Sequence, residues 1–191
     1  MTRIIAGYAG SLTLKVPSSG TRPTSDRVRE AIFSALESRD AIDGLRALDL
    51  YSGTGALGLE AASRGAVHVT LVDSTIAVSK QNAALILARA PRDARPEIVT
   101  TGQPVQAFLN SARSFWDLVF IDPPYELSTA ELERNLESLV PRLSPDAVVV
   151  VERSTRSTPP VLPEGLELER RKEYGDTVLY WLQPTLPSQP S

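Results

Sequence analysis

The sequence predicts an α/β protein with a mostly parallel sheet and an antiparallel C-terminal hairpin, preceded by a short N-terminal β-hairpin extension. Strand-like apolar segments alternate with helix-like segments through the middle of the chain, which is the pattern of a parallel sheet. Near the end, residues 166–173 and 177–182 are joined by only three residues, which leaves no room for a crossover helix. The length of 191 residues suits a single main domain.

The first part of the chain predicts a hairpin followed by an amphipathic helix. Residues 11–16 alternate polar and apolar side chains, and residues 3–6 can pair with them across a glycine-containing turn. From Val28 onward the apolar positions follow helical spacing, with Thr24 or Ser25 as the candidate N-cap. We therefore expect this helix to lead from the hairpin into the main domain.

Strands and helices then alternate. The predicted strands lie at residues 46–51, 67–72, 97–101, 117–121 and 147–151. The predicted helices lie at residues 56–64, from a Thr75 cap to a point before Pro91, near residues 105–110, and from Ser128 onward. Glu131 stands three residues after Ser128, which is the spacing of a capping box.

Three regions follow from this pattern. Residues 1–20 form the hairpin extension and residues 21–183 form the main domain. Residues 184–191 are rich in Pro and Ser, so we expect a disordered tail.

Composition excludes several classes of protein. The chain is 42% hydrophobic and 23% charged, and it has no apolar run near the roughly 18 residues that a membrane span needs. It has no Cys and a single His, His68, so zinc fingers, thiol catalysis and disulfide scaffolds are excluded and no metal site is expected. The first residues carry no secretory signal, which predicts a cytoplasmic location.

Charge is unevenly distributed along the chain. The formal net charge of −3 argues against a polycationic nucleic-acid binder. Within the first 29 residues, however, Asp26 is the only acidic residue. The basic residues of this segment are Arg3, Lys15, Arg22, Arg27 and Arg29. Such a local patch can contact phosphate, and the alternative is an ordinary solvated surface.

The first motif is the glycine pattern Gly53-x-Gly55-x-x-Gly58 between a predicted strand and a predicted helix. A nucleotide-type cofactor approaches the backbone closely at such a turn. Asp73 follows twenty residues after Gly53, where a carboxylate can accept both ribose hydroxyls, so the pattern also fits NAD. Asp49 would lie beside the head group, which favours the cationic amino-acid portion of S-adenosylmethionine over a pyrophosphate. The alternative is a turn without a ligand.

The second motif, Asp122-Pro123-Pro124-Tyr125, follows the predicted strand at residues 117–121 and so lies at the same edge of the sheet. The prolines stiffen the turn, and Asp122 and the Pro123 carbonyl offer two acceptors beside a flat aromatic face. Two such acceptors suit a planar ring with an exocyclic NH₂ group that stacks on Tyr125. This arrangement predicts methyl transfer from a sulfonium to that amine. The alternative is a polar turn without a function.

Five segments, taken together and in order, make the sequence similar to the bacterial 16S ribosomal RNA guanine-N2 methyltransferases. They are residues 3–7, 22–30, 48–60, 122–125 and 174–177, and the resemblance covers nearly all of residues 1–183. The glycine loop by itself is typical of any class I methyltransferase, and the Asp-Pro-Pro-Tyr motif of any enzyme that methylates an amino group. The first two segments are the specific part of the resemblance.

The resemblance implies a Rossmann-like class I methyltransferase sheet, with residues 21–183 as the methyltransferase domain. It implies methylation of N2 of one guanine in 16S rRNA, within a small ribosomal subunit or an assembly intermediate, by a monomeric enzyme. The implied S-adenosylmethionine contacts are Asp49, Tyr51, Ser52, Gly53, Gly55, Asp73, Ser74, Gly102 and Gln103. The implied catalytic residues that hold the base are Asp122, Pro123, Pro124 and Tyr125. The implied RNA contacts are Arg3, Lys15, Arg22, Thr24, Arg27 and Arg29.

Two departures from the family pattern stand out. Residues 9–13 are neutral where related proteins carry a basic stretch, so the hairpin's grip on RNA falls to Arg3 and Lys15. After the third predicted strand only Gln103 or backbone is available to contact adenine. Arg27 and Glu30 can equally form a structural pair on a solvated helix face.

Other functions stay open on the residues alone. The amine site also suits the N6 of adenine or a glutamine amide, although those enzymes more often have Asn in place of Asp122. An NAD-dependent oxidoreductase fits the glycine spacing but leaves Asp122 to Tyr125 without a task. A non-catalytic RNA-binding module would give Asp49 and Asp73 no function.

Overall fold

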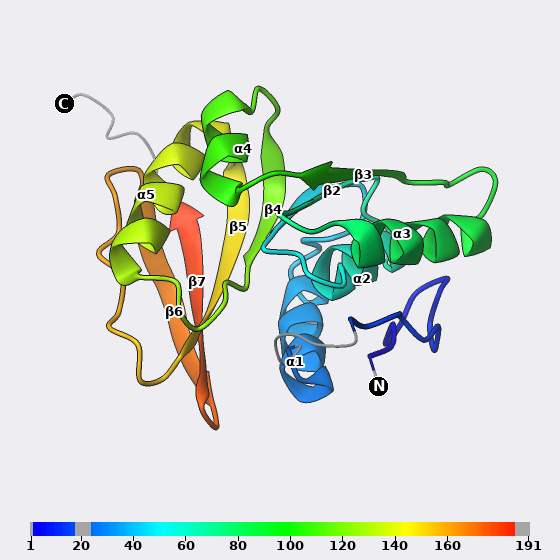
Figure 1. Ribbon diagram of the computed structural model, residues 1–191, viewed down its shortest axis with the longest axis horizontal. Coiled ribbons are helices and arrows are strands. Elements are labelled where there is room, and N and C mark those ends of the chain that lie inside the picture. The colour runs from blue at the N-terminus through cyan, green and yellow to red at the C-terminus, as the bar shows by residue number, and fades with distance from the viewer. Residues whose placement is uncertain (1, 18–23, 186–191) are drawn as a thin grey trace.

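The computed structural model describes residues 2–17 and 24–185, and within these residues seven strands form one sheet in the order β3-β2-β1-β4-β5-β7-β6. The five parallel strands are β1 (Arg46–Leu50), β2 (His68–Asp73), β3 (Glu97–Gly102), β4 (Trp116–Ile121) and β5 (Leu143–Ser154). The antiparallel pair is β6 (Leu166–Tyr174) and β7 (Thr177–Pro184), and β7 also pairs with β5 (Figure 1). The predicted fold class is confirmed.

Helices cover both faces of this sheet. The helices are α1 (Asp26–Glu37), α2 (Ala56–Ser63), α3 (Ala77–Arg89), α4 (Val105–Ser111) and α5 (Thr129–Leu139), followed by a short 3₁₀ turn at Val140–Arg142. Helices α1, α2 and α3 share one buried cluster, and α4 and α5 share the other. Strand β4 shows the division, because Leu118 and Phe120 face the first cluster while Val119 and Ile121 face the second. Figure 1 shows α4 and α5 grouped apart from α1, α2 and α3.

Side-chain caps fix two of the predicted helix starts. The Ser25 hydroxyl accepts a hydrogen bond from the Val28 amide at the start of α1, and the Ser128 hydroxyl accepts one from the Glu131 amide at the start of α5. The predicted Thr75 cap is wrong, because α3 begins at Ala77 and has no side-chain cap. The Thr75 amide instead donates to the carboxylate of Asp73, and this turn delays the helix.

The N-terminal segment pairs with itself less than expected. Residues 2–14 fold back antiparallel, but only one bridge forms, between Arg3 and Thr13. Side chains of α2 take several of its amides: Glu60 accepts from two of them and the Ser63 hydroxyl accepts from the amide of Ala9. The segment is therefore held by α2 as much as by its own pairing.

The division into regions stays a prediction. The boundary expected after residue 20 falls within residues 18–23, which lie outside the described residues. The expected tail begins at residue 184, and the structure describes only Pro184, which ends β7, and Thr185. None of the described helices is long and apolar enough to cross a membrane.

Candidate active site

Four acidic residues stand near the carboxyl ends of four adjacent strands. In sheet order they are Asp73 on β2, Asp49 on β1, Asp122 after β4 and Glu152 on β5. The four strands are parallel, so these side chains lie along one edge of the sheet. We refer to these four residues as the carboxylate row. Glu152 was not among the sequence-predicted site residues.

The glycine loop between β1 and α2 is held tightly at its ends and open at its tip. The Ser52 amide donates to the Val72 carbonyl of β2 at 3.0 Å, and the Gly53 amide donates to the Asp73 carboxylate at 2.9 Å. Gly53 has a φ of +52°, and a Cβ there would meet no atom within 4 Å. At Gly58, by contrast, a Cβ would lie 2.5 Å from the Leu71 side chain, so this glycine serves helix packing.

Asp49 is buried beneath this loop. The residue is only 1% exposed, and its carboxylate accepts a hydrogen bond from the Gly58 amide at 2.8 Å. Burial raises the pKa of Asp49 to about 8, with a smaller contribution from the nearby Asp122 and Asp73 carboxyls. No Lys or Arg among the described residues forms an ion pair with it. The position therefore suits a cationic ligand.

Tyr51 and Ser52 complete the loop. Tyr51 has a φ of +60°, unusual for a residue with a side chain, and its hydroxyl accepts a 2.5 Å hydrogen bond from the side-chain amide of Asn135. Asn135 is fully buried on α5, and nothing in the sequence pattern distinguished it. The Ser52 hydroxyl is also buried and has no hydrogen-bond partner among the described residues. It is available to a ligand.

The remaining predicted cofactor contacts lie beside Asp73. Gly102 ends β3 and pairs in register with Asp73, and the Gln103 amide donates to the Asp73 carbonyl at 3.1 Å. Ser74 follows β2 and is exposed. All nine predicted cofactor contacts thus cluster at or just beyond the ends of β1, β2 and β3, although no bound ligand tests their roles.

Asp122 is linked to β5 through the hydroxyl of Thr24, which lies just before α1. The Thr24 hydroxyl lies 2.5 Å from Asp122 Oδ2 and 3.0 Å from Glu152 Oε2. Ile121 pairs in register with Val151, so the residues that follow them, Asp122 and Glu152, stand side by side. Burial raises the pKa of Asp122 to about 6. Burial, and then the charge of Asp122, raises the pKa of Glu152 to about 8.

A sequence signal for Glu152 did exist. It directly follows the apolar residues 147–151, as Asp122 directly follows the predicted strand at residues 117–121. Adjacent parallel strands that each end in an acid place both acids at one edge. The pairing of β4 with β5, which the sequence alone does not specify, was the missing step.

The Asp122–Tyr125 turn presents its aromatic ring to solvent. Tyr125 is 65% exposed, whereas Pro123 is buried. The chain just after the turn is anchored, because the Arg153 guanidinium donates to the Leu127 carbonyl at 3.0 Å. The Tyr125 face is therefore free to stack on a planar group beside Asp122.

The predicted RNA contacts divide into exposed and buried side chains. Arg3, Lys15 and Arg27 are exposed, and Lys15 Nζ donates to the Gln81 side chain at 2.9 Å. Thr24 is buried against the carboxylate row. Arg22 lies outside the described residues.

Arg29 does not fit the predicted contact with RNA. Its side chain is fully buried, donates to the Arg3 carbonyl and to Asp26 at 2.7 Å, and lies 3.8 Å from the fully buried Glu60. Arg29 fastens the N-terminal segment onto α1 and α2. The helical spacing left this orientation undecided, because an arginine can occupy a buried position when it is paired.

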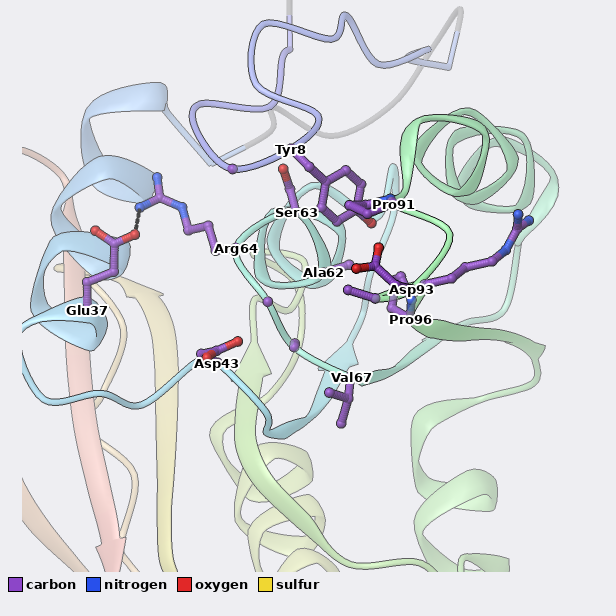
Figure 2. A pocket seen from close by; sticks show the side chains of 15 residues that line it. Tyr8, Glu37, Asp43, Ala62, Ser63, Arg64, Val67, Pro91, Asp93 and Pro96 are labelled. Carbon is purple, nitrogen blue, oxygen red and sulfur yellow. Dashed lines mark hydrogen bonds and ion pairs between the residues drawn. The ribbon is translucent and has the colours of Figure 1, made fainter.

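A surface pocket of about 570 Å³ lies away from the carboxylate row. It is lined by residues that precede β1, β2 and β3, including Asp43, Val67 and Pro96 (Figure 2). Their positions before the strands place the pocket at the opposite edge of the sheet. Two cations line it, Arg64 and Arg95, and Arg64 is already paired with Glu37 at 2.8 Å. None of the sequence-predicted site residues lines it. Across residues 2–17 and 24–185, no group of three potential metal ligands is found.

Comparisons with known proteins identify the family of this chain. The family model described as "Conserved hypothetical protein 95" matches residues 2–183. Ribosomal RNA small subunit methyltransferase D of Escherichia coli is 36% identical over 174 residues, which cover 91% of this chain and 85% of that protein. A putative rRNA methyltransferase of Bacillus subtilis is 30% identical over 177 residues, covering 92% and 95% of the two chains.

Solved structures give the same result. A putative methyltransferase from Escherichia coli superposes with a TM-score of 0.79 at 33% identity, covering 95% of this chain and 97% of that chain. Magnesium protoporphyrin IX methyltransferase from Synechocystis, at 14% identity and a TM-score of 0.65 over 87% of each chain, shares the fold. Because the family model spans nearly the whole chain and the Escherichia coli relative is 36% identical, the protein belongs to this methyltransferase family and is itself a methyltransferase.

Proposed function

We propose that the protein transfers a methyl group from S-adenosylmethionine to the exocyclic N2 of one guanine in 16S rRNA. The observation that carries this proposal is the position of Asp122 and the exposed Tyr125 beside the buried Asp49, which forms no ion pair with any described residue. Asp122 and Tyr125 suit a planar amine, and Asp49 suits a cation. The small-subunit rRNA named for several relatives supports the choice of substrate.

The residues around the glycine loop fit this cofactor. Asp49 offers a buried carboxylate to a cationic amino-acid group, and the Ser52 hydroxyl offers a hydrogen bond that no described residue takes. Asp73 already accepts from two amides, and its remaining lone pairs can accept ribose hydroxyls. S-adenosylmethionine, when bound, supplies a methyl group on a positively charged sulfur.

The turn after β4 orients the acceptor amine. The Asp122 carboxylate and the Pro123 carbonyl can each accept one amino hydrogen, and stacking on Tyr125 is worth roughly 1–3 kcal/mol. Accepting both hydrogens favours a more tetrahedral nitrogen, whose lone pair is then available for attack. With a pKa of about 6, Asp122 is ionised at neutral pH and can take the surplus proton from the methylated nitrogen.

The exposed cations of the N-terminal segment and α1 contact the RNA backbone. Arg3, Lys15 and Arg27 are available for this, and Arg22 belongs to the same basic segment of the sequence. The guanine must be unpaired or flipped out, at a cost of a few kcal/mol. A small ribosomal subunit or an assembly intermediate, acted on in the cytoplasm by a monomeric enzyme, is the substrate we propose.

The deciding experiment is transfer of labelled methyl from S-adenosylmethionine to small subunits purified from cells that lack the activity. Digestion to nucleosides then identifies the modified base. N2-methylguanosine is the expected product. Labelled N6-methyladenosine, or label found only in protein, would contradict the proposal and favour the adenine or glutamine-amide alternative.

A further inference from the structure

The two carboxyls of Asp122 and Glu152 converge on one hydroxyl, and that hydroxyl has a single proton. Thr24 Oγ1 lies 2.5 Å from Asp122 Oδ2 and 3.0 Å from Glu152 Oε2, so both contacts are hydrogen bonds by distance. The Thr24 proton can make a linear hydrogen bond to only one carboxyl. The other contact is a hydrogen bond only if that carboxyl itself carries a proton and donates it to Thr24.

The distances indicate which carboxyl carries this proton. Hydrogen bonds from a hydroxyl to a carboxylate anion are short, about 2.5–2.7 Å, whereas bonds between neutral groups are longer. The two distances have the order expected for an ionised Asp122 and a neutral Glu152. The raised pKa values have the same order, with Glu152 at about 8 and Asp122 at about 6.

The surroundings favour one proton on this pair. Asp49 on β1 faces Asp122 from the other side, and Asp73 on β2 lies beyond it, so the neighbouring charged groups of the carboxylate row are acidic. On β7, the residue opposite Glu152 is Leu179, which is apolar. No Lys or Arg within residues 2–17 and 24–185 forms an ion pair with Asp122 or Glu152. Two anions sharing the Thr24 hydroxyl would repel each other, and no cation among the described residues pairs with either of them.

We infer that Glu152 is a positioning residue that holds a proton at neutral pH and, through Thr24, keeps Asp122 ionised and oriented toward the amino group. This inference rests on the proposed function. The hydrogen bonds run in one direction, from Glu152 to Thr24 and from Thr24 to Asp122. Of this pair of carboxyls, only Asp122 is then an anion, and its second oxygen is free for an amino hydrogen.

This arrangement accounts for each bond and each proton of the methyl transfer. The lone pair of the amino nitrogen forms the new bond to the methyl carbon, and the electrons of the breaking carbon–sulfur bond stay with sulfur, which becomes neutral. The nitrogen, now positive, loses one proton to the Asp122 carboxylate. Glu152 keeps its proton throughout, and Asp122 returns its proton to water before the next turnover.

The first test measures the proton directly and needs no substrate. The full-length protein is labelled with carbon-13 at its Asp and Glu carboxyls and titrated by NMR, with Glu152→Gln and Asp122→Asn used to assign the two signals. We expect the Glu152 carboxyl to be protonated at pH 7 and to ionise near pH 8, and the Asp122 carboxyl to ionise near pH 6. Two ionised carboxyls at pH 7 would overturn the inference.

The second test compares variants in single-turnover methyl transfer across pH. Glu152→Ala should lower the rate at pH 7 between about tenfold and a hundredfold, the size expected for a misplaced catalytic group, while the affinity for S-adenosylhomocysteine stays unchanged. Glu152→Gln should restore most of this loss, because its amide can donate to Thr24 as the protonated acid does. Thr24→Val should resemble Glu152→Ala, and Thr24→Ser should resemble the wild type.

The pH profile separates positioning from a structural role. The wild-type rate should fall as Glu152 ionises above about pH 8, and Glu152→Gln should not show this fall. Any ionisation of the RNA affects the wild type and Glu152→Gln equally. Glu164→Gln, at an exposed position, is the matched control and should show the same pH profile as the wild type. An identical alkaline fall in wild type and Glu152→Gln would overturn the inference. A methyl group found on another base would instead contradict the proposed guanine substrate. The NMR titration would still decide whether Glu152 carries the proton, because it uses no substrate.

Discussion

At the scale of single residues, Asp49 combines two opposed requirements. Its burial favours the neutral acid, with a pKa of about 8 against an ordinary value of 3.8, whereas a cationic ligand requires the anion. The raised pKa means that its contribution to stability is full below about pH 4 and is lost as the pH rises toward 8. The protein thus gives up stability at the pH at which it binds its ligand.

Replacement of Asp49 by asparagine tests this trade. The amide side chain would keep an acceptor for the Gly58 amide but could not ionise. Asp49→Asn should therefore unfold at a higher temperature than wild type, and the difference in unfolding temperature should widen between pH 5 and pH 8. Each kcal/mol corresponds to about 2–4 °C at this size. The same variant should lose affinity for S-adenosylhomocysteine. Thermal unfolding with and without that ligand measures both effects, and the exposed Asp43→Asn is the control. A gap that does not change with pH would contradict the raised pKa.

Asp122 gives the complementary result. Asp122→Ala should bind S-adenosylhomocysteine like the wild type, because Asp122 lies beyond the glycine loop, and should lose at least about a hundredfold in transfer rate, as expected for a general base. Calorimetric titration and single-turnover transfer measure the two quantities separately. Transfer close to the wild-type rate would remove Asp122 from its proposed role.

At the scale of secondary-structure elements, Asn82 joins three segments. From its fully buried place on α3, its side-chain amide donates to the Lys15 carbonyl at 3.0 Å and to the Thr54 carbonyl at 2.9 Å, and its oxygen accepts from the Lys15 amide at 2.8 Å. The N-terminal segment and the glycine loop therefore share one anchor. An element assigned to RNA is fastened to an element assigned to the cofactor.

Asn82→Ala should weaken both ends of this connection. It leaves three partly buried backbone groups without this partner, each at a cost of up to about 1–3 kcal/mol. We therefore expect a lower unfolding temperature and weaker S-adenosylhomocysteine binding. The neighbouring Gln81→Ala removes only the exposed contact with Lys15 Nζ and should change neither quantity measurably. Equal effects of the two substitutions would show that Asn82 is not the anchor.

The sequence predicted most elements and fewer of the contacts between them. Apolar runs bounded by Gly and Pro determine the strands and helices locally, and the caps Ser25 and Ser128 act within one turn, so these were found correctly. The Thr75 cap failed because Asp73 competes for its amide. Arg29 and Glu152 depend on segments distant in sequence, which no local pattern specifies.

At the scale of the whole molecule, charge of opposite sign lies in separate places. The carboxylate row lines one edge of the sheet, while the exposed cations assigned to RNA lie on the N-terminal segment and on α1. The net charge is only −3, so long-range attraction to RNA is not expected from the protein as a whole. Phosphate contacts should therefore come from a few local side chains.

Two arginines of α1, Arg27 and Arg29, can show whether RNA binding depends on local phosphate contacts or on the total charge of the protein. Binding to small subunits should weaken linearly in log–log form as salt is added, and Arg27→Ala should reduce that slope by about one because one phosphate contact is lost. Arg29→Ala removes a buried partner of Glu60 and should lower the unfolding temperature, with a salt slope that stays at the wild-type value. The exposed Arg113→Ala, which follows α4 in the other helix layer, should change neither. Filter-binding titrations from low to physiological salt measure the slopes. If Arg27→Ala and Arg113→Ala reduced the slope equally, RNA binding would depend on the total charge of the protein and not on the cations of the N-terminal segment and α1.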